Sequence, residues 1–203
     1  ACGPTGTVVH ASGGIPGDIH KLWRSHAPTD YHSEYGYSCM GYEIAGGLGV
    51  KMAQPDRDVG VLVGDGSYLM MNSEIATSIA LGQKLTIVLL DNRGYGCISR
   101  LQNACGGDAF NNLLDEAAPR IDFVAHARAL GAHAEKADDL AALEAALTRA
   151  IRADRTAVVV IDTDPVHSTA AGGAWWNVPV AEVSPSTRVR DAHADYRRHL
   201  DEQ

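Results

Sequence analysis

The stretch from Val59 to Gly96 constrains the fold of this chain more than any other part of the sequence. Two short apolar runs, Val59–Val63 and Leu85–Leu90, have the length and composition of buried β-strands. Between them, apolar residues recur at helical spacing over residues 68–81, and Gly82 is a typical helix stop. A strand, a helix and a second strand in this order predict a βαβ unit with parallel strands.

Further apolar segments extend this unit into an α/β fold. Runs of strand character recur at Thr7–Val9 and Ala157–Ile161. Alternating strands and helices predict a doubly wound, mainly parallel sheet with helices on both faces. We expect helices at residues 40–52, 122–130 (with Asp122 as N-cap), 138–151 and 189–203, a helix that opens at residues 20–23, and loops at residues 12–18 and 103–119.

Both central strands end in polar loops. Gly64-Asp65-Gly66-Ser67 follows the first strand, and Asp91-Asn92-Arg93-Gly94 follows the second. Ligands of open parallel sheets bind at the carboxyl ends of the strands, so we expect Asp65 and Asn92 to be neighbours. Carboxylate and amide oxygens suit Mg²⁺ or Ca²⁺ rather than zinc. The two loops therefore predict a site for a hard divalent cation.

The glycines of the first loop indicate a phosphate ligand. Gly64 and Gly66 let the backbone approach a phosphate, and the helix that starts near Ser67 presents unpaired N–H groups to it. A nicotinamide-dinucleotide fold is a competing interpretation that requires G-x-G-x-x-G, but Leu69 occupies the third glycine position. A lone G-D-G is also common in ordinary turns. It is the pairing of the two loops that favours a diphosphate held by magnesium.

Composition argues against two classes of partner. Lys and Arg number 17 against 25 Asp and Glu, and the resulting net charge of −8 disfavours a nucleic-acid-binding surface. No apolar run reaches membrane-spanning length, so we expect no membrane partner. The four cysteines form no C-x-x-C pair, and we expect them to be free thiols in a cytoplasmic protein.

The two polar loops resemble the signature of thiamine-diphosphate-dependent enzymes. In that signature G-D-G-S is followed by N-x-G, and here Asn92 lies 27 positions after Asp65. The resemblance implies that Asp65, Asn92 and the carbonyl of Gly94 bind Mg²⁺. It also implies that the backbone around Gly64, and with it Gly66 and Ser67, contacts the diphosphate of the cofactor.

Two upstream segments resemble other parts of the cofactor site in these enzymes. Ser38-Cys39-Met40-Gly41 resembles the segment whose large apolar residue supports the bent conformation of thiamine diphosphate. The resemblance gives that function to Met40 and turns the carbonyl of Ser38 toward the aminopyrimidine. His20 stands where related enzymes have a histidine that contacts the diphosphate, although an ordinary polar residue at a helix start is an equally good interpretation.

Longer segments resemble one family more closely, the trihydroxycyclohexane-1,2-dione hydrolases of inositol breakdown. The matching segments are residues 16–24, 34–57, 64–75, 89–98 and 172–184. This resemblance implies a cyclic polyol dione as substrate and cleavage of its C–C bond to give 5-deoxyglucuronate. It also implies a homo-oligomer whose site is shared with a pyrimidine-binding domain. The activating glutamate would come from that domain, so we expect no catalytic residue in this chain and no turnover by the chain alone.

The same resemblance suggests how the chain is divided. We expect residues 1–165 to be the diphosphate-binding domain, without its N-terminal part, and residues 166–203 to be a tail. Trp175 and Trp176 in that tail could cover the cofactor as a lid or anchor the tail at an interface. His32 and Glu34 could bind a substrate rich in hydroxyl groups, or could be packing or surface residues.

Two other functions remain open at this point. One is a different thiamine-diphosphate enzyme, similar to acetolactate synthase or to a 2-oxoacid decarboxylase, because pocket contacts rather than the cofactor set the substrate. The other is a module that uses this fold only for assembly.

Overall fold

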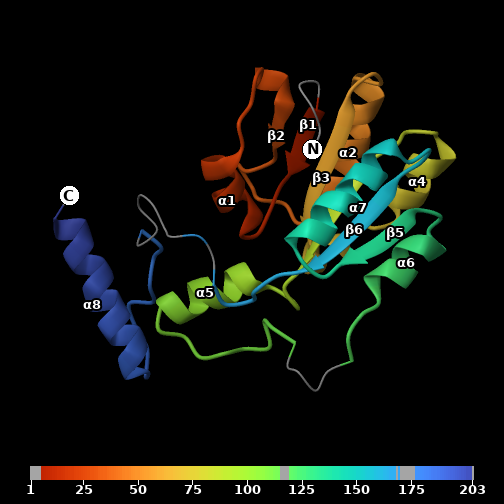
Figure 1. The fold of residues 1–203 in the computed structure, drawn as a ribbon. Coiled ribbons are helices and arrows are strands. Elements are labelled where there is room, and N and C mark those ends of the chain that lie inside the picture. The colour runs from red at the N-terminus through yellow and green to blue at the C-terminus, as the bar shows by residue number, and fades with distance from the viewer. Residues whose placement is uncertain (1–5, 115–118, 168, 170–176, 203) are drawn as a thin grey trace.

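The fold is a single parallel β-sheet with helices packed on both faces (Figure 1). The computed structural model describes residues 6–114, 119–167, 169 and 177–202. Six strands pair in the order β2-β1-β3-β4-β6-β5, and every pairing is parallel. The strands are β1 (Gly6–His10), β2 (Tyr31–Ser33), β3 (Asp58–Gly64), β4 (Thr86–Asp91), β5 (His133–Ala137) and β6 (Ala157–Asp162).

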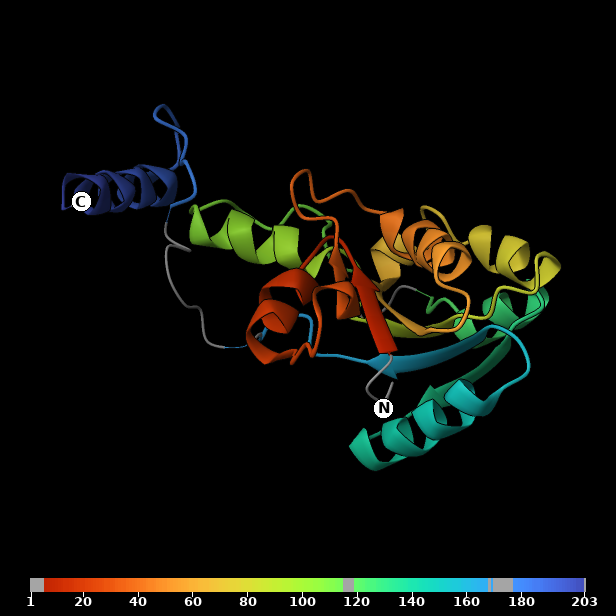
Figure 2. The same cartoon turned by 90° about the horizontal axis from the view of Figure 1, so that it is seen from above.

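Helices connect the strands and cover the sheet. Figure 2 shows α2 and α4 on one side of the sheet and α7 on the other. Together with the strand order, this confirms the predicted doubly wound α/β fold. The helices are α1 (Ile15–Leu22), α2 (Tyr42–Ala53), α3 (Asp65–Tyr68), α4 (Glu74–Ala80), α5 (Gly96–Ala104), α6 (Phe123–Ala129), α7 (Leu140–Arg152) and α8 (Thr187–Asp201), with a short 3₁₀ helix at Pro28–Asp30.

Strand β6 shows how one apolar run serves both faces. Successive side chains of a strand point to opposite sides of the sheet. Val158 and Val160 pack into the larger core beneath α2, α4 and α6, whereas Ala157 and Val159 pack against α7. A strand buried on both faces reads as a continuous apolar run, which is why Ala157–Ile161 was predicted correctly.

Two helix starts were also predicted correctly. The Asp122 carboxylate accepts a hydrogen bond from the backbone N–H of Ala125 at 2.8 Å and caps α6. The Asp139 carboxylate accepts from the N–H of Ala142 at 2.7 Å and caps α7. Aspartate satisfies an otherwise unpaired N–H of the first helical turn in this way.

The predicted continuous helix over residues 68–81 is wrong. The chain instead forms the single turn α3 and, after a break, α4. Tyr68 and Ile75 are both fully buried, and these two residues produced the helical periodicity. Leu69, Met70 and Met71 between them are 42–50% exposed, so the intervening residues do not continue a core-facing helical stripe.

Two other local expectations are wrong as well. Helix α1 starts at Ile15 and not at His20, because Pro16 lies in its first turn, where proline is favoured. Residues 15–18 are therefore helical rather than part of a loop. Strand β5 was missed because it is an edge strand whose residues, except Ala137, are not buried.

The parallel arrangement brings several loops to one edge of the sheet. The carboxyl ends of β1, β3, β4 and β6 lie next to one another, since these strands are consecutive in the sheet. The loops that follow them begin at Ala11, Asp65, Asn92 and Thr163. Among the described residues, no helix has both the length and the apolar composition needed to cross a bilayer.

Candidate functional site

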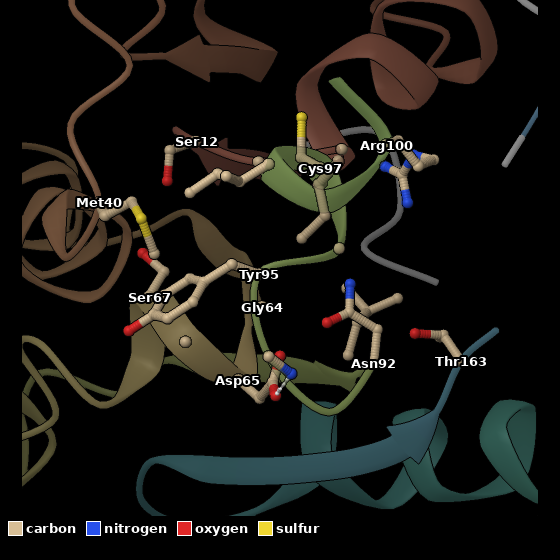
Figure 3. A pocket seen from close by; sticks show the side chains of 18 of the residues that line it. Ser12, Met40, Gly64, Asp65, Ser67, Asn92, Tyr95, Cys97, Arg100 and Thr163 are labelled. Carbon is tan, nitrogen blue, oxygen red and sulfur yellow. Dashed lines mark hydrogen bonds between the residues drawn. The ribbon is translucent and has the colours of Figure 1, made fainter. Parts of the chain in front are cut away.

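A cavity of about 650 Å³ lies at this edge of the sheet (Figure 3). Met40 and Ser67 lie toward one end of it and Arg100 and Thr163 toward the other, with Asn92 between them in this view. The residues that line the cavity come from the segments after five strands, β1, β2, β3, β4 and β6, and several of them belong to α1, α3 and α5. They include Ser12, Gly13, Gly14, Ile15, Asp18, Ser38, Met40, Gly64, Asp65, Gly66, Ser67, Asn92, Gly94, Tyr95, Gly96, Cys97, Arg100, Leu101, Thr163, Asp164 and His167.

Three oxygen-bearing groups converge at the centre of the cavity. The Asp65 carboxylate, which is 5% exposed, accepts a hydrogen bond from the N–H of Gly94 at 2.6 Å. The amide oxygen of Asn92 faces both Asp65 Oδ1 and the carbonyl oxygen of Gly94. Turning the amide over satisfies both contacts, because its nitrogen then donates hydrogen bonds to these two atoms at 3.1 Å and 2.8 Å. Asp65 and Asn92 are therefore neighbours, as their positions at adjacent strand ends predicted.

This donor set fits a hard divalent cation. A carboxylate, an amide oxygen and a backbone carbonyl are ligands of Mg²⁺ or Ca²⁺, and Mg²⁺ needs only one or two protein carboxylates. Without a cation, the turned-over Asn92 amide can donate hydrogen bonds to the other two groups, and the opposite orientation presents its oxygen to a cation. Within the described part of the chain, no group of three or more His, Cys, Asp or Glu side chains is arranged to hold a metal. The fit therefore depends on Asp65 with two neutral oxygens.

The electrostatics of Asp65 are consistent with a nearby cation. Burial, reinforced by the negative charge of Asp91, raises the pKa of Asp65 to about 6. Backbone N–H groups of Gly94, Gly66 and Asn92 oppose this rise by hydrogen bonding to the carboxylate. A positive charge at the convergence point would favour the ionised carboxylate.

The loop before α3 has the shape of a phosphate cradle. Helix α3 begins directly at Asp65, so its first N–H groups have no partner within the helix. A Cβ atom at Gly66 would stand 2.6 Å from the ring of Tyr95, so a larger residue there would require that ring to shift. The Gly64 and Gly66 backbones therefore line the cavity without side chains in the way.

The Ser67 side chain has a different role from the one that its sequence position suggests. Its hydroxyl accepts a hydrogen bond from the N–H of Gly41 at 2.7 Å and donates to Glu43 Oε2 at 2.7 Å. Glu43 is 1% exposed and also accepts from the N–H and the hydroxyl of Ser12 at 3.3 and 3.4 Å. The hydroxyl of Ser67 thus connects the segment after β3 to the start of α2. Only the backbone of Ser67 is then available to a phosphate.

Ser38 and Met40 both line the cavity, as the sequence resemblance implied. The segment that carries them has left-handed backbone at Ser38 (φ 52°) and at Gly41 (φ 90°). Gly41 is the N-cap of α2, and its N–H is the group bonded to Ser67. The segment is therefore attached to the loop after β3.

His20 does not line the cavity. It lies in the last turn of α1, where its ring packs 5.1 Å from that of Tyr35, 5.6 Å from that of Tyr31 and 5.8 Å from that of His10 (centroid distances). The expectation placed it at the start of a helix, but α1 starts five residues earlier, and Ser12–Ile15 and Asp18 reach the cavity instead.

His32 and Glu34 also lie outside the cavity lining. The His32 ring stacks on Tyr42, and its Nε2 is 2.6 Å from the tyrosine hydroxyl. Glu34 accepts hydrogen bonds from the N–H groups of Cys39 and Tyr37, and these bonds lower its pKa. Both residues thus have partners in the protein. The lid predicted at Trp175 and Trp176 lies outside the described residues.

Several lining residues were not singled out from the sequence. Arg100, Cys97 and Leu101 belong to α5, for which no helix was predicted, although the position directly after the N-x-G-Y-G run could have indicated one. Glu43 could have been noticed as a charged residue within the otherwise apolar segment Tyr42–Leu48. A buried charge usually marks a network or a site.

Comparison with known proteins agrees with this geometry. Residues 11–161 match the family model "Thiamine pyrophosphate enzyme, C-terminal TPP binding domain". The chain is 41% identical over 199 residues to the 3D-(3,5/4)-trihydroxycyclohexane-1,2-dione hydrolase of Shouchella clausii, covering 97% of this chain and 31% of that protein. It is 39% identical over 202 residues to the Bacillus subtilis protein of the same name, covering 96% and 31%. The chain thus spans about a third of the curated relatives it matches.

Solved structures agree on the fold. Benzoylformate decarboxylase from Polynucleobacter necessarius superposes with a TM-score of 0.71 at 21% identity, over 79% of this chain and 30% of that one. The 4-hydroxybenzoylformate decarboxylase of Rhodococcus jostii superposes with a TM-score of 0.72 at 21% identity, over 78% of this chain and 29% of that one. By the family match over most of its length, this chain belongs to the thiamine pyrophosphate enzymes, as a C-terminal TPP binding domain.

Proposed function

We propose that this chain is the magnesium- and thiamine-diphosphate-binding domain of a hydrolase that cleaves a C–C bond of a trihydroxycyclohexane-1,2-dione in inositol degradation. The observation that carries the cofactor part is the convergence of the Asp65, Asn92 and Gly94 oxygens inside a cavity at the sheet edge. The substrate part rests on the names of relatives that are about 40% identical.

The proposal assigns each residue a task. Asp65, Asn92 and the Gly94 carbonyl hold Mg²⁺, while the backbone from Gly64 to Ser67 binds the diphosphate. Met40 and the carbonyl of Ser38 form the wall against which the aminopyrimidine lies. When bound, thiamine diphosphate would supply a nucleophilic carbanion, and the protein supplies binding and orientation.

The remaining parts of the proposal concern the whole protein. The activating glutamate belongs to a pyrimidine-binding domain, residues 1–165 form the diphosphate-binding domain, and residues 166–203 form a tail at a lid or interface. Assembly into a homo-oligomer is expected because a site of about 650 Å³ at a sheet edge needs a second surface to exclude water. Cys39, Cys97 and Cys105 are free thiols, which supports a reducing compartment such as the cytoplasm.

Calorimetry on the complete gene product that carries this chain tests the cofactor part. We expect heat on addition of Mg²⁺ and thiamine diphosphate, and none after Asp65→Ala. Asp154→Ala removes an exposed carboxylate elsewhere and serves as the matched control, which should bind like the parent protein. Equal heat from the parent protein and Asp65→Ala, or none from the parent protein, contradicts the proposal.

An activity assay tests the substrate part. The complete gene product should hydrolyse the cyclic dione and leave pyruvate unchanged, whereas preferential turnover of pyruvate would indicate a different thiamine-diphosphate enzyme. No heat on addition of thiamine diphosphate and Mg²⁺, and no difference in Asp65→Ala, would favour an assembly module. The 203-residue chain alone should not hydrolyse the dione, because the activating glutamate is expected elsewhere.

A further inference from the structure

We infer that Arg100 is a second binding group for the anionic tail of the cofactor, beside the predicted magnesium ligand Asn92 and not itself a metal ligand. This inference rests on the proposed function and names a residue of that site which neither the sequence motif nor the family resemblance assigns.

The first observation is the position of the Arg100 guanidinium. Its Nη1 lies 3.3 Å from the point where a Cβ atom on Gly96 would stand, and the side-chain nitrogen of Asn92 lies 2.9 Å from the same point. The guanidinium is therefore a close neighbour of the predicted metal ligand Asn92, at a separation that one diphosphate group can bridge. Figure 3 shows Asn92 between Ser67 and Arg100 in the view of the cavity.

The second observation is that the first turn of α1 lies against the same guanidinium. Arg100 Nη2 is 2.6 Å from the position of a Cβ on Gly14, the N-cap residue of α1, and this N-cap has no side-chain hydrogen bond. A helix N-terminus carries partial positive charge. Two positive groups that face one volume are stabilised by an anion between them, and both line the cavity.

The third observation is that the cavity's other carboxylates are already engaged. Asp18 accepts a hydrogen bond from the Thr169 hydroxyl. Asp164 accepts from the N–H groups of Val166 and His167 at 2.8 and 2.9 Å, and its other oxygen lies 2.8 Å from the His167 ring. Within the part of the chain that the structure describes, no ion pair involves Arg100.

Charge balance connects these observations to a diphosphate. A diphosphate carries more negative charge than one Mg²⁺ neutralises, and the cavity already holds Asp18, Asp65 and Asp164. A guanidinium offers a planar fork of donors that matches two phosphate oxygens, so it binds phosphate with direction as well as charge. Arg100 thus takes the position that the sequence resemblance gave to His20, which the structure places outside the cavity.

Titrations of the complete gene product with thiamine diphosphate and with inorganic pyrophosphate, each with saturating Mg²⁺, test the inference. Arg100→Gln should raise the Kd for both ligands on the order of 10- to 100-fold. Arg100→Lys keeps the positive charge but loses the planar fork of donors. Its Kd values should lie between those of the parent protein and those of Arg100→Gln. Arg152→Gln removes an exposed arginine of α7 far from the cavity and should leave both constants unchanged.

Each result decides between distinct explanations. If Arg100→Gln binds both ligands as tightly as the parent protein, the inference is wrong, whether or not its KM for the dione rises; a raised KM would assign Arg100 to the substrate. If the parent protein binds Mg²⁺-pyrophosphate but not thiamine diphosphate, the cofactor assignment fails while the effect of Arg100→Gln on pyrophosphate still measures its role. A thermal melt of each variant shows whether it is folded, and the lysine variant preserves the test if the glutamine variant is not.

Discussion

The hydroxyl of Ser67 donates a 2.7 Å hydrogen bond to the buried carboxylate of Glu43. Through this contact the loop after β3 is connected to the start of α2, and through Ser12 it is also connected to the loop after β1. Three segments that line one cavity thus share a single acceptor group. The network orients backbone groups toward the cavity without any of its side chains having to touch a ligand.

Glu43→Ala should therefore weaken both the fold and cofactor binding. The substitution leaves the buried donors of Ser12 and Ser67 without their acceptor, at a cost of about 2–4 kcal/mol in the free energy of unfolding. Glu43→Gln retains one acceptor oxygen, so its loss in the free energy of unfolding should be roughly half of the loss in Glu43→Ala. Urea unfolding and calorimetry with thiamine diphosphate measure the two effects. A Glu43→Ala protein with the parent's cofactor Kd would show that the network does not position the loops.

Asp65→Asn should separate stability from cation binding. Without added divalent cation, this variant should be more stable than the parent protein by roughly 1–3 kcal/mol at pH 7, because it removes a buried charge that Asp91 repels. With Mg²⁺ and thiamine diphosphate the parent protein should gain in melting temperature, and the variant should gain little. Melting curves in EDTA measure the difference in stability without cation, and melting curves in excess Mg²⁺ with thiamine diphosphate measure the gain on binding. Equal gains for the two proteins would remove Asp65 from the metal site.

His10 should make stability depend on pH below neutrality. It is fully buried, and burial, followed by the nearby charges of His20 and His32, lowers its pKa from 6.5 to about 4. Between these two values the unfolded chain binds a proton that the folded chain does not, so stability is present above pH 6.5 and is lost as the pH falls toward 4. The loss should reach roughly 2–3 kcal/mol.

His10→Leu should lack this component of the pH dependence. Unfolding midpoints of the parent protein and the leucine variant, measured from pH 7.5 to pH 4.5, give the comparison. The difference between the two curves should change as the pH falls, because only the parent protein loses stability through His10. A constant difference across the range would mean that His10 does not titrate as its burial requires.

Two glycines of α2 should respond to alanine in opposite directions. A Cβ at Gly47 would stand 2.5 Å from Val61 Cγ2 in the core, so Gly47→Ala should destabilise the domain by about 1–3 kcal/mol. Gly49 is exposed and has open space around its Cα, so Gly49→Ala should stabilise by about 0.5–1 kcal/mol. Chemical denaturation of the matched pair checks this. A stabilising Gly47→Ala would mean that α2 can move away from β3 at little cost.

The parts of the fold that the sequence predicted correctly are those with redundant local signals. Val59–Val63 and Leu85–Leu90 are apolar throughout because they are buried on both faces, and Asp122 and Asp139 combine a capping side chain with a helical stripe. The neighbourhood of Asp65 and Asn92 followed from the geometry of parallel strand ends. That argument needs only the strand order, not the details of the loops.

The parts that were missed depend on contacts distant in sequence. His20 lies in the last turn of α1 rather than in its first, because the helix begins at Ile15. Arg100 reaches the cavity because Gly14 and Gly96 leave room for it. Strand β5 carries little apolar signal, since it lies at the edge of the sheet and only Ala137 of it is buried. No local pattern contains this information.

The cation-binding oxygens also report on how the strands are aligned. Gly64 pairs with Leu90, and Leu90 pairs in turn with Ile161, so the carboxylate and the amide meet only in this alignment. A slip of β4 by one residue would turn Asn92 toward the opposite face of the sheet and separate the ligands. Titrating a refolding sample with magnesium would therefore count the molecules whose central strands have assembled correctly.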